Sequence, residues 1–248
     1  MRENHLLNIA KNKLKYSIND LKNEIQNPKS KIQTPDGAFE KMDKMYRHQR
    51  YFYDFTRKYY LLGRDKLIAK MDVQWGENIL EVGCGTGRNL VILANKFPKA
   101  IFYGLDASAA MLETANAKIE AKNISNISLK NALADDFDYK KTFDLEKPFD
   151  TIYFSYSISM IPTWQGSIQN ALANLQRGRS IYIVDFYDQR DLPAWFRRIL
   201  QSWLKQFHVK YPKDLMPHLE SLEKQGLGKL SVTSIYKSYS FIAEFKKV

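Results

Sequence analysis

The chain has 248 residues, 44% of them hydrophobic, which is enough for one substantial core and too few for two full domains. Its one cysteine, Cys84, excludes an internal disulfide and is typical of a reducing compartment. The first residues lack the apolar region of a signal peptide, and no run of about 18 apolar residues that could span a membrane occurs.

The net charge of +11 is unevenly distributed. Residues 1–70 hold 16 Lys/Arg against 8 Asp/Glu and residues 190–248 hold 11 against 5, whereas residues 71–189 hold 11 against 14. Basic flanks around a mildly acidic centre indicate an anionic partner, either nucleic acid or a membrane surface. A solvated lysine-rich surface is the alternative interpretation.

The first 70 residues are predicted to be helical. Apolar residues recur every three or four positions from Leu7 to Ile25, and Asn27-Pro28 ends that helix. A second helical segment is expected from Ala38 to Met71, broken near Gly63. We therefore expect residues 1–70 to form a helical segment that acts as a lid, and residues 71–248 to form the main domain.

The main domain alternates β and α segments. Strands are predicted at residues 78–82, 101–105, 127–130, 151–155 and 180–185, and residues 229–247 alternate like two strands joined by a short turn. Helices are predicted from the end of the first strand to residue 96, and at 108–122, 168–175 and 192–207. This order predicts an α/β fold with a mostly parallel, doubly wound sheet whose last strand is antiparallel.

The most informative stretch is ILEVGCGTG, residues 79–87. Glycines after a first strand let the backbone approach a ligand closely, and the following helix offers free N–H groups. The spacing differs from the dinucleotide fingerprint, because the third glycine comes one residue early. Glu81 stands two residues before the first glycine, where a carboxylate would repel a pyrophosphate and attract an ammonium group.

The pattern E-x-G-x-G-x-G resembles the first motif of the class I S-adenosylmethionine (SAM) methyltransferases. The resemblance covers about residues 75–189 and implies a seven-stranded, Rossmann-like sheet. It also implies that Glu81 faces the methionine ammonium of SAM, while Gly83, Cys84, Gly85 and Gly87 pass under the cofactor.

Asp106 ends the second strand about 20 residues beyond the glycine turn, where an acid can bind the ribose hydroxyls. An N-cap for the helix near Ser108 is the alternative role. Ala107 and Met111 would flank the adenine. Where the family usually has Gly-Asp-Ala, this chain has Ala132, Leu133 and Ala134, so the adenine edge is expected to meet the backbone near Ala134 or a shifted Asp135 or Asp136.

The fourth strand leads into FSYSISMIPTW, residues 154–164. The Asn/Asp-Pro-Pro-aromatic motif of nucleobase amino methyltransferases does not occur there, which argues against DNA amino methylation. Ser155, Tyr156 and Ser157 form a hydroxyl-rich rim instead. Ser155 is predicted at the cofactor and Tyr156 in catalysis; ordinary strand-end capping is the alternative.

Three longer blocks are similar to the bacterial enzymes that N-methylate diacylglyceryl-homoserine to the betaine lipid diacylglyceryl-N,N,N-trimethylhomoserine. They are YRHQRYFYDFTRKYYLLGRD (46–65), YSISMIP (156–162) and IVDFYDQRDLPAWFRRILQSWLKQFHV (183–209). These blocks lie outside the shared cofactor motifs. Within the first, Tyr53-Asp54 matches a local pattern that implies Tyr53 leans over the cofactor near the sulfonium.

Amine methylation needs a neutral amine held close to the sulfonium more than a strong base. An α-amino group titrates near pH 8, so positioning supplies most of the rate. Tyrosine faces can hold the charge that builds on nitrogen, and an arginine can bind the homoserine carboxylate. His48 could take the leaving proton, or could be an ordinary surface residue. The candidates for holding the charge on nitrogen are Tyr46, Tyr51, Tyr53, Tyr59, Tyr60 and Tyr156, with packing in the core as the alternative for several of them. The candidates for the carboxylate are Arg50, Arg57 and Arg64.

Such a substrate keeps its fatty tails in a bilayer. Helices 7–25 and 192–207 have apolar and basic faces that suit a headgroup layer, although the second could equally pack on the sheet. We expect a cytoplasmic enzyme at the inner face of the membrane, working with the enzyme that makes diacylglyceryl-homoserine, without nucleic acid or metal. The alternatives are a phosphatidylethanolamine N-methyltransferase, an RNA or small-molecule methyltransferase, or a SAM-binding subunit that activates a partner.

Overall fold

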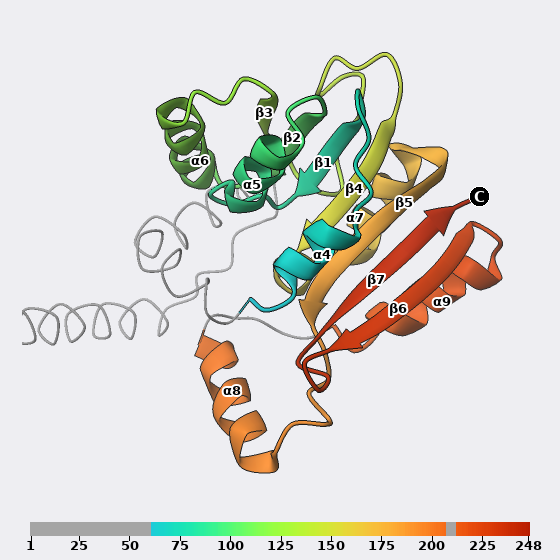
Figure 1. Ribbon diagram of the computed structural model, residues 1–248. Helices are drawn as coiled ribbons and strands as arrows, with labels where there is room; N and C mark the ends of the chain where they lie inside the picture. Colours follow the sequence, from blue (N-terminus) through green and yellow to red (C-terminus); the bar gives the residue numbers. More distant parts are fainter. Residues whose placement is uncertain (1–60, 207–211) are drawn as a thin grey trace, which may run out of the picture. The chain divides into compact units, whose positions relative to one another are not determined.

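A computed structural model describes residues 61–206 and 212–248, which form a seven-stranded sheet with helices on both faces (Figure 1). The strands are β1 (Asn78–Val82), β2 (Ile101–Asp106), β3 (Ile127–Asn131), β4 (Phe149–Ser155), β5 (Leu175–Phe186), β6 (Gly228–Ile235) and β7 (Ser240–Lys247). The helices are α4 (Arg64–Lys70), α5 (Arg88–Lys96), α6 (Ala109–Ala121), the short 3₁₀ helix η1 (Ile158–Met160), α7 (Trp164–Ala173), α8 (Ala194–Gln206) and α9 (Leu215–Lys224).

The strand order is β3-β2-β1-β4-β5-β7-β6. The first five strands are parallel, and β7 enters antiparallel between β5 and β6. This confirms the predicted fold class and the closing hairpin. The chain moves outward in opposite directions from β1 and β4, and open α/β sheets bind ligands at the carboxyl ends of strands at such a reversal.

Each face of the sheet has its own apolar core. Helices α4, α5 and α6 cover one face, with Leu67, Leu90 and Leu112 against the sheet. Helices α7 and α9 cover the other, with Ile168 and Leu219 in the second cluster (Figure 1). The parallel strands are buried on both faces, which explains why β1 reads as a continuous buried run.

The largest differences from the predicted elements concern α7, β5 and α9. Helix α7 begins at Trp164, four residues early, and Leu175 belongs to β5 instead of to the helix. Strand β5 also begins five residues before the predicted Ser180, across a register irregularity opposite β4. Helix α9 was not predicted, because Pro217 obscures its apolar stripe; proline is tolerated there since it falls within the first turn.

Helix α4 begins directly after Gly63, where the sequence predicts a break; the helical segment expected before it lies outside the described residues. Gly63 is the N-cap of this helix with φ of 97°, and a Cβ atom there would lie 2.3 Å from Ile235 Cδ1. A non-glycine residue would therefore be both strained and in collision with β6. Helix α4, which belongs to the predicted N-terminal segment, packs against α5 and β5.

The rest of the predicted N-terminal segment lies outside the described residues, and its role as a lid stays a prediction. This applies to helix 7–25 and to Tyr46, His48, Arg50, Tyr51, Tyr53, Arg57, Tyr59 and Tyr60. Among the helices that the structure describes, none is long and apolar enough to cross a membrane.

Candidate cofactor-binding site

The glycine turn lies at the carboxyl end of β1, between β2 and β4. The N–H groups of Gly83 and Cys84 both donate to the carbonyl of Leu105, at 2.9 and 3.0 Å. Gly83 has φ of 74°, and a Cβ atom on it would lie 2.6 Å from Ser157 Cβ. Only glycine can bring the backbone this close to the end of β4, and its lack of a side chain leaves room for a ligand beside the turn.

Glu81 lies on the same face of β1 as Ile79, because side chains alternate along a strand. It is 2% exposed. Its Oε1 accepts a hydrogen bond from Asn89 Nδ2 at 2.7 Å, and its Oε2 accepts one from the Tyr153 hydroxyl at 3.0 Å. The parallel register sets Tyr153 beside Glu81 on β4, and Asn89 comes from the first turn of α5.

Burial raises the pKa of Glu81 to about 7, although both hydrogen bonds and the charge of Arg64 favour the ionised form. The same burial raises the pKa of Tyr153 well above its usual range, so this hydroxyl stays a donor. A carboxyl group with its pKa near neutrality is held ready for a cationic ligand. An ammonium group brought next to it would stabilise the carboxylate and lower its pKa.

Asp106 ends β2 at the other side of the turn. Its Oδ2 accepts a hydrogen bond from the Gly85 N–H at 2.8 Å, and its Oδ1 accepts one from the Ser108 N–H at 2.9 Å. The N-cap of α6 is Ser108, whose Oγ accepts from the Met111 N–H. The alternative in which Asp106 caps this helix is therefore wrong. Carboxylate oxygens accept more than one hydrogen bond each, so the predicted ribose contact is compatible with this geometry.

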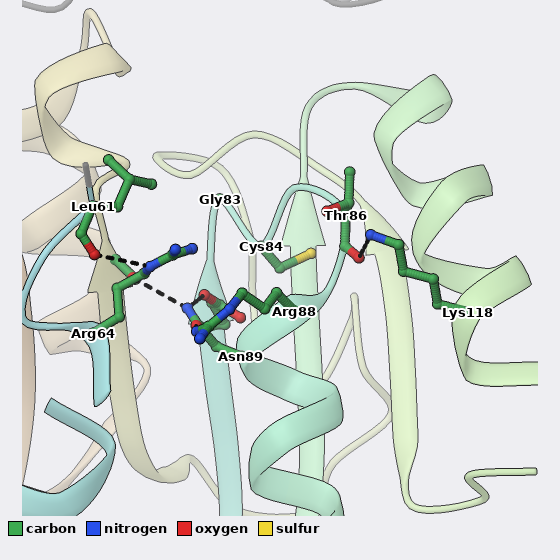
Figure 2. Close-up of a pocket in the computed structure, with 10 residues that line it drawn as sticks. Leu61, Arg64, Gly83, Cys84, Thr86, Arg88, Asn89 and Lys118 are labelled. Carbon is green, nitrogen blue, oxygen red and sulfur yellow. Dashed lines mark hydrogen bonds between the residues drawn. The ribbon is translucent and has the colours of Figure 1, made fainter. Parts of the chain in front are cut away.

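A cavity of about 220 Å³ opens over the turn (Figure 2). Figure 2 shows Arg64 of α4 on one side of Gly83 and Lys118 of α6 beyond Thr86 on the other. The residues that line it are Leu61, Arg64, Glu81, Gly83, Cys84, Thr86, Arg88, Asn89, Lys118 and Ser155. It thus holds four predicted cofactor contacts, Glu81, Gly83, Cys84 and Ser155.

Arg64 and Glu81 line the same cavity. Arg64 is 8% exposed, and its Nε donates to the Leu61 carbonyl at 3.2 Å. A buried guanidinium and a buried carboxyl group in one small cavity match the two ends of a zwitterionic amino acid. The methionine end of SAM is such a zwitterion, so the residues present fit the cofactor. Across the described residues, no group of three His, Cys, Asp or Glu side chains gathers as a metal site requires.

Several lining residues were missed from the sequence. Asn89 donates to Glu81 and also to Ser155 Oγ at 3.1 Å, so its amide joins β1 to β4. Arg88 Nη2 meets Asp65 of α4 at 3.2 Å, and Lys118 Nζ donates to the Thr86 carbonyl at 3.3 Å. The position of Asn89, two residues after the last glycine of the turn, could have identified it from the sequence. Nothing in the sequence indicated that Lys118, 32 residues after Thr86, would contact the turn.

Tyr156 lies elsewhere. It is 2% exposed with φ of 56°. Its hydroxyl donates to the Leu62 carbonyl, and its ring meets Phe186 edge-on, with the ring centroids 4.8 Å apart. It is not among the residues lining the cavity, and burial raises the pKa of its hydroxyl well above the usual range. These contacts tie β4 to the chain entering α4. Its catalytic role stays a prediction.

The predicted adenine contacts lie beyond the cavity. Met111 is buried in α6, Ala107 and Ala134 are half-buried, and Asp135 is exposed. The Ala134 carbonyl accepts a hydrogen bond from Asn170 Nδ2 at 3.4 Å. Their contacts with adenine stay predictions.

Comparisons with known proteins agree with this geometry. Residues 74–230 match the family described as "Methyltransferase domain". The demethylmenaquinone methyltransferase of Listeria welshimeri is 23% identical over 193 residues, covering 75% of this chain and 79% of that protein. The trans-aconitate 2-methyltransferase of Deinococcus radiodurans is 33% identical over 176 residues, covering 66% and 62%.

Solved structures share the fold. A SAM-dependent methyltransferase from Aquifex aeolicus aligns with a TM-score of 0.54 at 16% identity, over 88% of this chain and all of that one. With a family match across more than half its length, and with a glycine turn, a buried acid and a zwitterion cavity where that fold binds its cofactor, this chain belongs to the methyltransferase-domain family and is a SAM-dependent methyltransferase of the class I fold.

Proposed function

We propose that this enzyme N-methylates the amino group of diacylglyceryl-homoserine three times, giving a betaine lipid. The observation that carries the substrate assignment is the similarity of residues 46–65, 156–162 and 183–209 to enzymes of that reaction, because these blocks lie outside the motifs that every SAM methyltransferase shares. The cavity at β1 supports the cofactor half of the reaction and leaves the acceptor open.

Bound SAM supplies an electrophilic methyl group on sulfur. Glu81 is assigned to the methionine ammonium, because its buried carboxyl group gains a counter-charge there. Arg64 was predicted from the sequence to hold the homoserine carboxylate. Its place in the same cavity as Glu81 favours the cofactor carboxylate instead, which leaves Arg50 and Arg57 as sequence-based candidates for the acceptor.

The acceptor amine requires positioning more than proton abstraction. Its α-amino group titrates near pH 8, so a useful fraction is neutral at physiological pH. Within the described residues, the cavity lining carries no histidine and its one acid is assigned to the cofactor. Proximity to the sulfonium is therefore the main source of the rate in this proposal.

The lipid substrate places the enzyme at a membrane surface. Helix α8 carries Trp195, which is 66% exposed, and the exposed Arg198, while Leu200 on the same helix is buried in the core. One face of α8 thus packs, and another offers an aromatic ring beside a cation, the combination that interfacial helices use. We place the protein on the inner face of an anionic membrane, where it would work with the enzyme that makes diacylglyceryl-homoserine.

A test uses radiolabelled SAM with the purified chain and vesicles that contain one acceptor at a time. Diacylglyceryl-homoserine should be labelled in one, two and three steps, and phosphatidylethanolamine should not. The variant Asp106→Ala serves as the control that lacks cofactor binding. Labelling of phosphatidylethanolamine alone, or of no amine lipid, would overturn the substrate assignment and leave the methyltransferase assignment intact.

A quinone is the second candidate acceptor. The demethylmenaquinone methyltransferase of Listeria welshimeri aligns over 75% of this chain and 79% of its own length, and a prenylated quinone is also a membrane lipid. Vesicles that contain demethylmenaquinone form a further arm of the same assay. Label in the quinone with none in the amine lipids would favour this candidate.

A further inference from the structure

One amide group bonds two other polar groups of the cofactor cavity. Asn89, in the first turn of α5, is 6% exposed and lines this cavity (Figure 2). Its Nδ2 donates to Glu81 Oε1 at 2.7 Å and to Ser155 Oγ at 3.1 Å, so both amide protons are used. Because Glu81 and Ser155 line the cavity too, Asn89 acts on two groups that a ligand in it can reach.

The orientation of this amide is fixed by its neighbour in the sequence. Arg88 Nη1 donates to Asn89 Oδ1 at 3.2 Å. A guanidinium only donates hydrogen bonds, and a carboxylate only accepts them. An amide turned the other way would set its oxygen against the Glu81 carboxylate and its NH₂ group against the guanidinium. Asn89 therefore has one favourable orientation, with its protons toward β1 and β4.

The Glu81 carboxyl group is held by a neutral donor on each oxygen. Asn89 donates to Oε1, and the hydroxyl of the fully buried Tyr153 donates to Oε2 at 3.0 Å. Each carboxylate oxygen accepts more than one hydrogen bond, so lone pairs remain for a ligand. A lysine or arginine in place of these donors would neutralise the carboxylate. Neutral donors fix its plane and leave its charge for the methionine ammonium of SAM.

The Ser155 hydroxyl accepts one bond and keeps its own proton to donate. Ser155 is 8% exposed, at the carboxyl end of β4. Within the part of the chain that the structure describes, its Oγ accepts from Asn89 and donates to no protein group. Because Asn89 occupies one side of this oxygen, the proton is left for an acceptor in the cavity. The carboxylate at the methionine end of SAM is such an acceptor, and the buried Arg64 lines the same cavity.

We propose that Asn89 is a positioning residue of the cofactor site, which holds the Glu81 carboxylate toward the ammonium of SAM and leaves the Ser155 hydroxyl to donate to the SAM carboxylate. Arg88 extends this chain of bonds to α4, because its Nη2 meets Asp65 at 3.2 Å. The role concerns the cofactor alone and goes beyond the proposed function, because it is the same for any methyl acceptor.

This role makes SAM binding depend on pH in a way that a purely structural residue does not. Burial is the largest influence on the pKa of Glu81 and raises it to about 7, and the bond from Asn89 opposes that rise. Without this bond the pKa rises further, so less of the carboxylate is ionised near neutrality. The other groups that act on Glu81 or feel its charge are Tyr153, Arg64, Asp106 and Cys84. They are the same in the wild type and in an Asn89 variant.

The test compares Asn89→Leu with the wild type by calorimetric titration of SAM in the absence of any methyl acceptor. Leucine has nearly the same shape as asparagine and no polar atom. We expect the Kd for SAM to rise about 10-fold at about pH 7.5, and about 30- to 100-fold at about pH 6, where the variant keeps less of its Glu81 ionised.

Two further variants separate the two bonds of Asn89. Tyr153→Phe removes only the donor to Glu81 Oε2, so its loss of affinity should also grow toward acid pH. Ser155→Ala removes the donor to the SAM carboxylate and no group that acts on the Glu81 charge. Its Kd for SAM should therefore rise by the same factor, about 3- to 10-fold, at both pH values.

Asn174 supplies the matched control, because it is a buried amide that does not line the cavity. It is 3% exposed, accepts from the Tyr139 N–H at 2.7 Å and donates to the Phe137 carbonyl at 3.1 Å. Asn174→Leu should lower the melting temperature, as Asn89→Leu does, and should bind SAM normally at both pH values. Asn89→Ala removes the same bonds as Asn89→Leu and gives the same comparison if leucine prevents folding.

Normal SAM binding by the Asn89 variants, or a loss of the same size at both pH values, would overturn the positioning role. A loss in Asn174→Leu that grows toward acid pH would overturn it as well, because any buried amide would then have this effect. No acceptor is present in the titration. A failure of the proposed lipid substrate would therefore leave these results unchanged, and a failure here would leave the substrate assignment untouched.

Discussion

The chemistry of the cofactor site depends on a few buried side chains, of which Glu81 is central. Its carboxyl group is 2% exposed and has two neutral hydrogen-bond donors, Asn89 and Tyr153. Burial is the largest influence on it and raises its pKa from the ordinary 4.5 to about 7. Between pH 4.5 and about 7, the folded protein without cofactor therefore keeps a proton on Glu81 that the unfolded chain has lost.

The stability of the cofactor-free protein should reflect this proton. Because the folded-state pKa is raised, Glu81 favours folding below pH 4.5, and this contribution is lost as the pH rises through about 7. The loss is about 3 kcal/mol in order of magnitude. In Glu81→Gln, the free energy of unfolding, measured in urea from pH 4 to 8, should therefore change less with pH than in the wild type. Burial raises the pKa of Glu244, but Lys70 and hydroxyl groups lower it below its usual value. Glu244→Gln should therefore lower the free energy of unfolding at higher pH. An unchanged slope in Glu81→Gln would contradict the assignment.

Arg64 and Glu81 are expected to hold opposite ends of the same ligand. Arg64→Met and Glu81→Gln should each weaken SAM binding about 10- to 100-fold, since each removes a charge-assisted hydrogen bond in a buried site. Isothermal calorimetry measures this without any acceptor. Arg190→Met, at an exposed pair with Asp188, is the matched control and should bind normally. If Arg64→Met also bound normally, the arginine would return to the acceptor side.

At the level of elements, the start of α4 depends on close contact with β6. Gly63 has φ of 97°, and a Cβ atom there would collide with Ile235 Cδ1. The Leu62 carbonyl next to it accepts hydrogen bonds from Tyr156 and, at 3.2 Å, from Ser240 Oγ. Contacts from β4, β6 and β7 thus position the helix that carries Arg64.

Gly63→Ala should therefore be destabilising for two reasons that can be separated. Gly178 has a similar positive φ, and a Cβ atom added there would have nothing within 4 Å. Gly178→Ala should therefore lower the free energy of unfolding only by the cost of backbone strain, about 1–2 kcal/mol. Gly63→Ala should lose about 0.5–1.5 kcal/mol more, the cost of turning the Ile235 side chain out of its rotamer to relieve the collision. In an Ile235→Val background, which lacks Cδ1, Gly63→Ala should approach the loss seen at Gly178. Urea unfolding measures all four; equal losses at the two glycines in the wild-type background would exclude the collision.

At the level of the whole molecule, charge separates the flanks from the centre. The chain carries +11 overall, while the described centre holds the acids of the cofactor site. If the proposed function holds, this charge would draw the protein to an anionic surface by many weak contacts of about 1 kcal/mol each, which salt weakens.

Vesicle binding should accordingly depend on lipid charge and salt. Sedimentation with anionic vesicles should recover the protein at low ionic strength and lose it at about 0.5 M salt, and neutral vesicles should recover little. The double variant Arg197→Ala/Arg198→Ala on α8 should bind more weakly. Lys229→Ala/Lys237→Ala, on β6 and the hairpin turn, removes the same charge elsewhere. Equal weakening by both pairs would mean that net charge, and not α8, directs the binding.

The sequence by itself determined the layers of the sheet and the cofactor. Strands buried on both faces appear as continuous apolar runs, and an acid two residues before a glycine turn has a local physical meaning, so Glu81, Gly83 and Asp106 could be predicted as cofactor contacts without coordinates. The three blocks behind the substrate proposal are likewise local patterns. Helix α9 could have been found from Leu215, Leu219 and Leu222, had Pro217 not hidden their spacing.

Only the tertiary structure decided which residues meet. The pairing of Glu81 with Tyr153 depends on the register of β1 against β4, and Arg64 reaches the same cavity because Gly63 lets α4 pack where it does. The bond from Asn89 to Ser155, 66 positions along the chain, could not be foreseen either. Whether a buried polar atom has a partner depends on residues far away in the chain, and no local pattern of residue types carries that information.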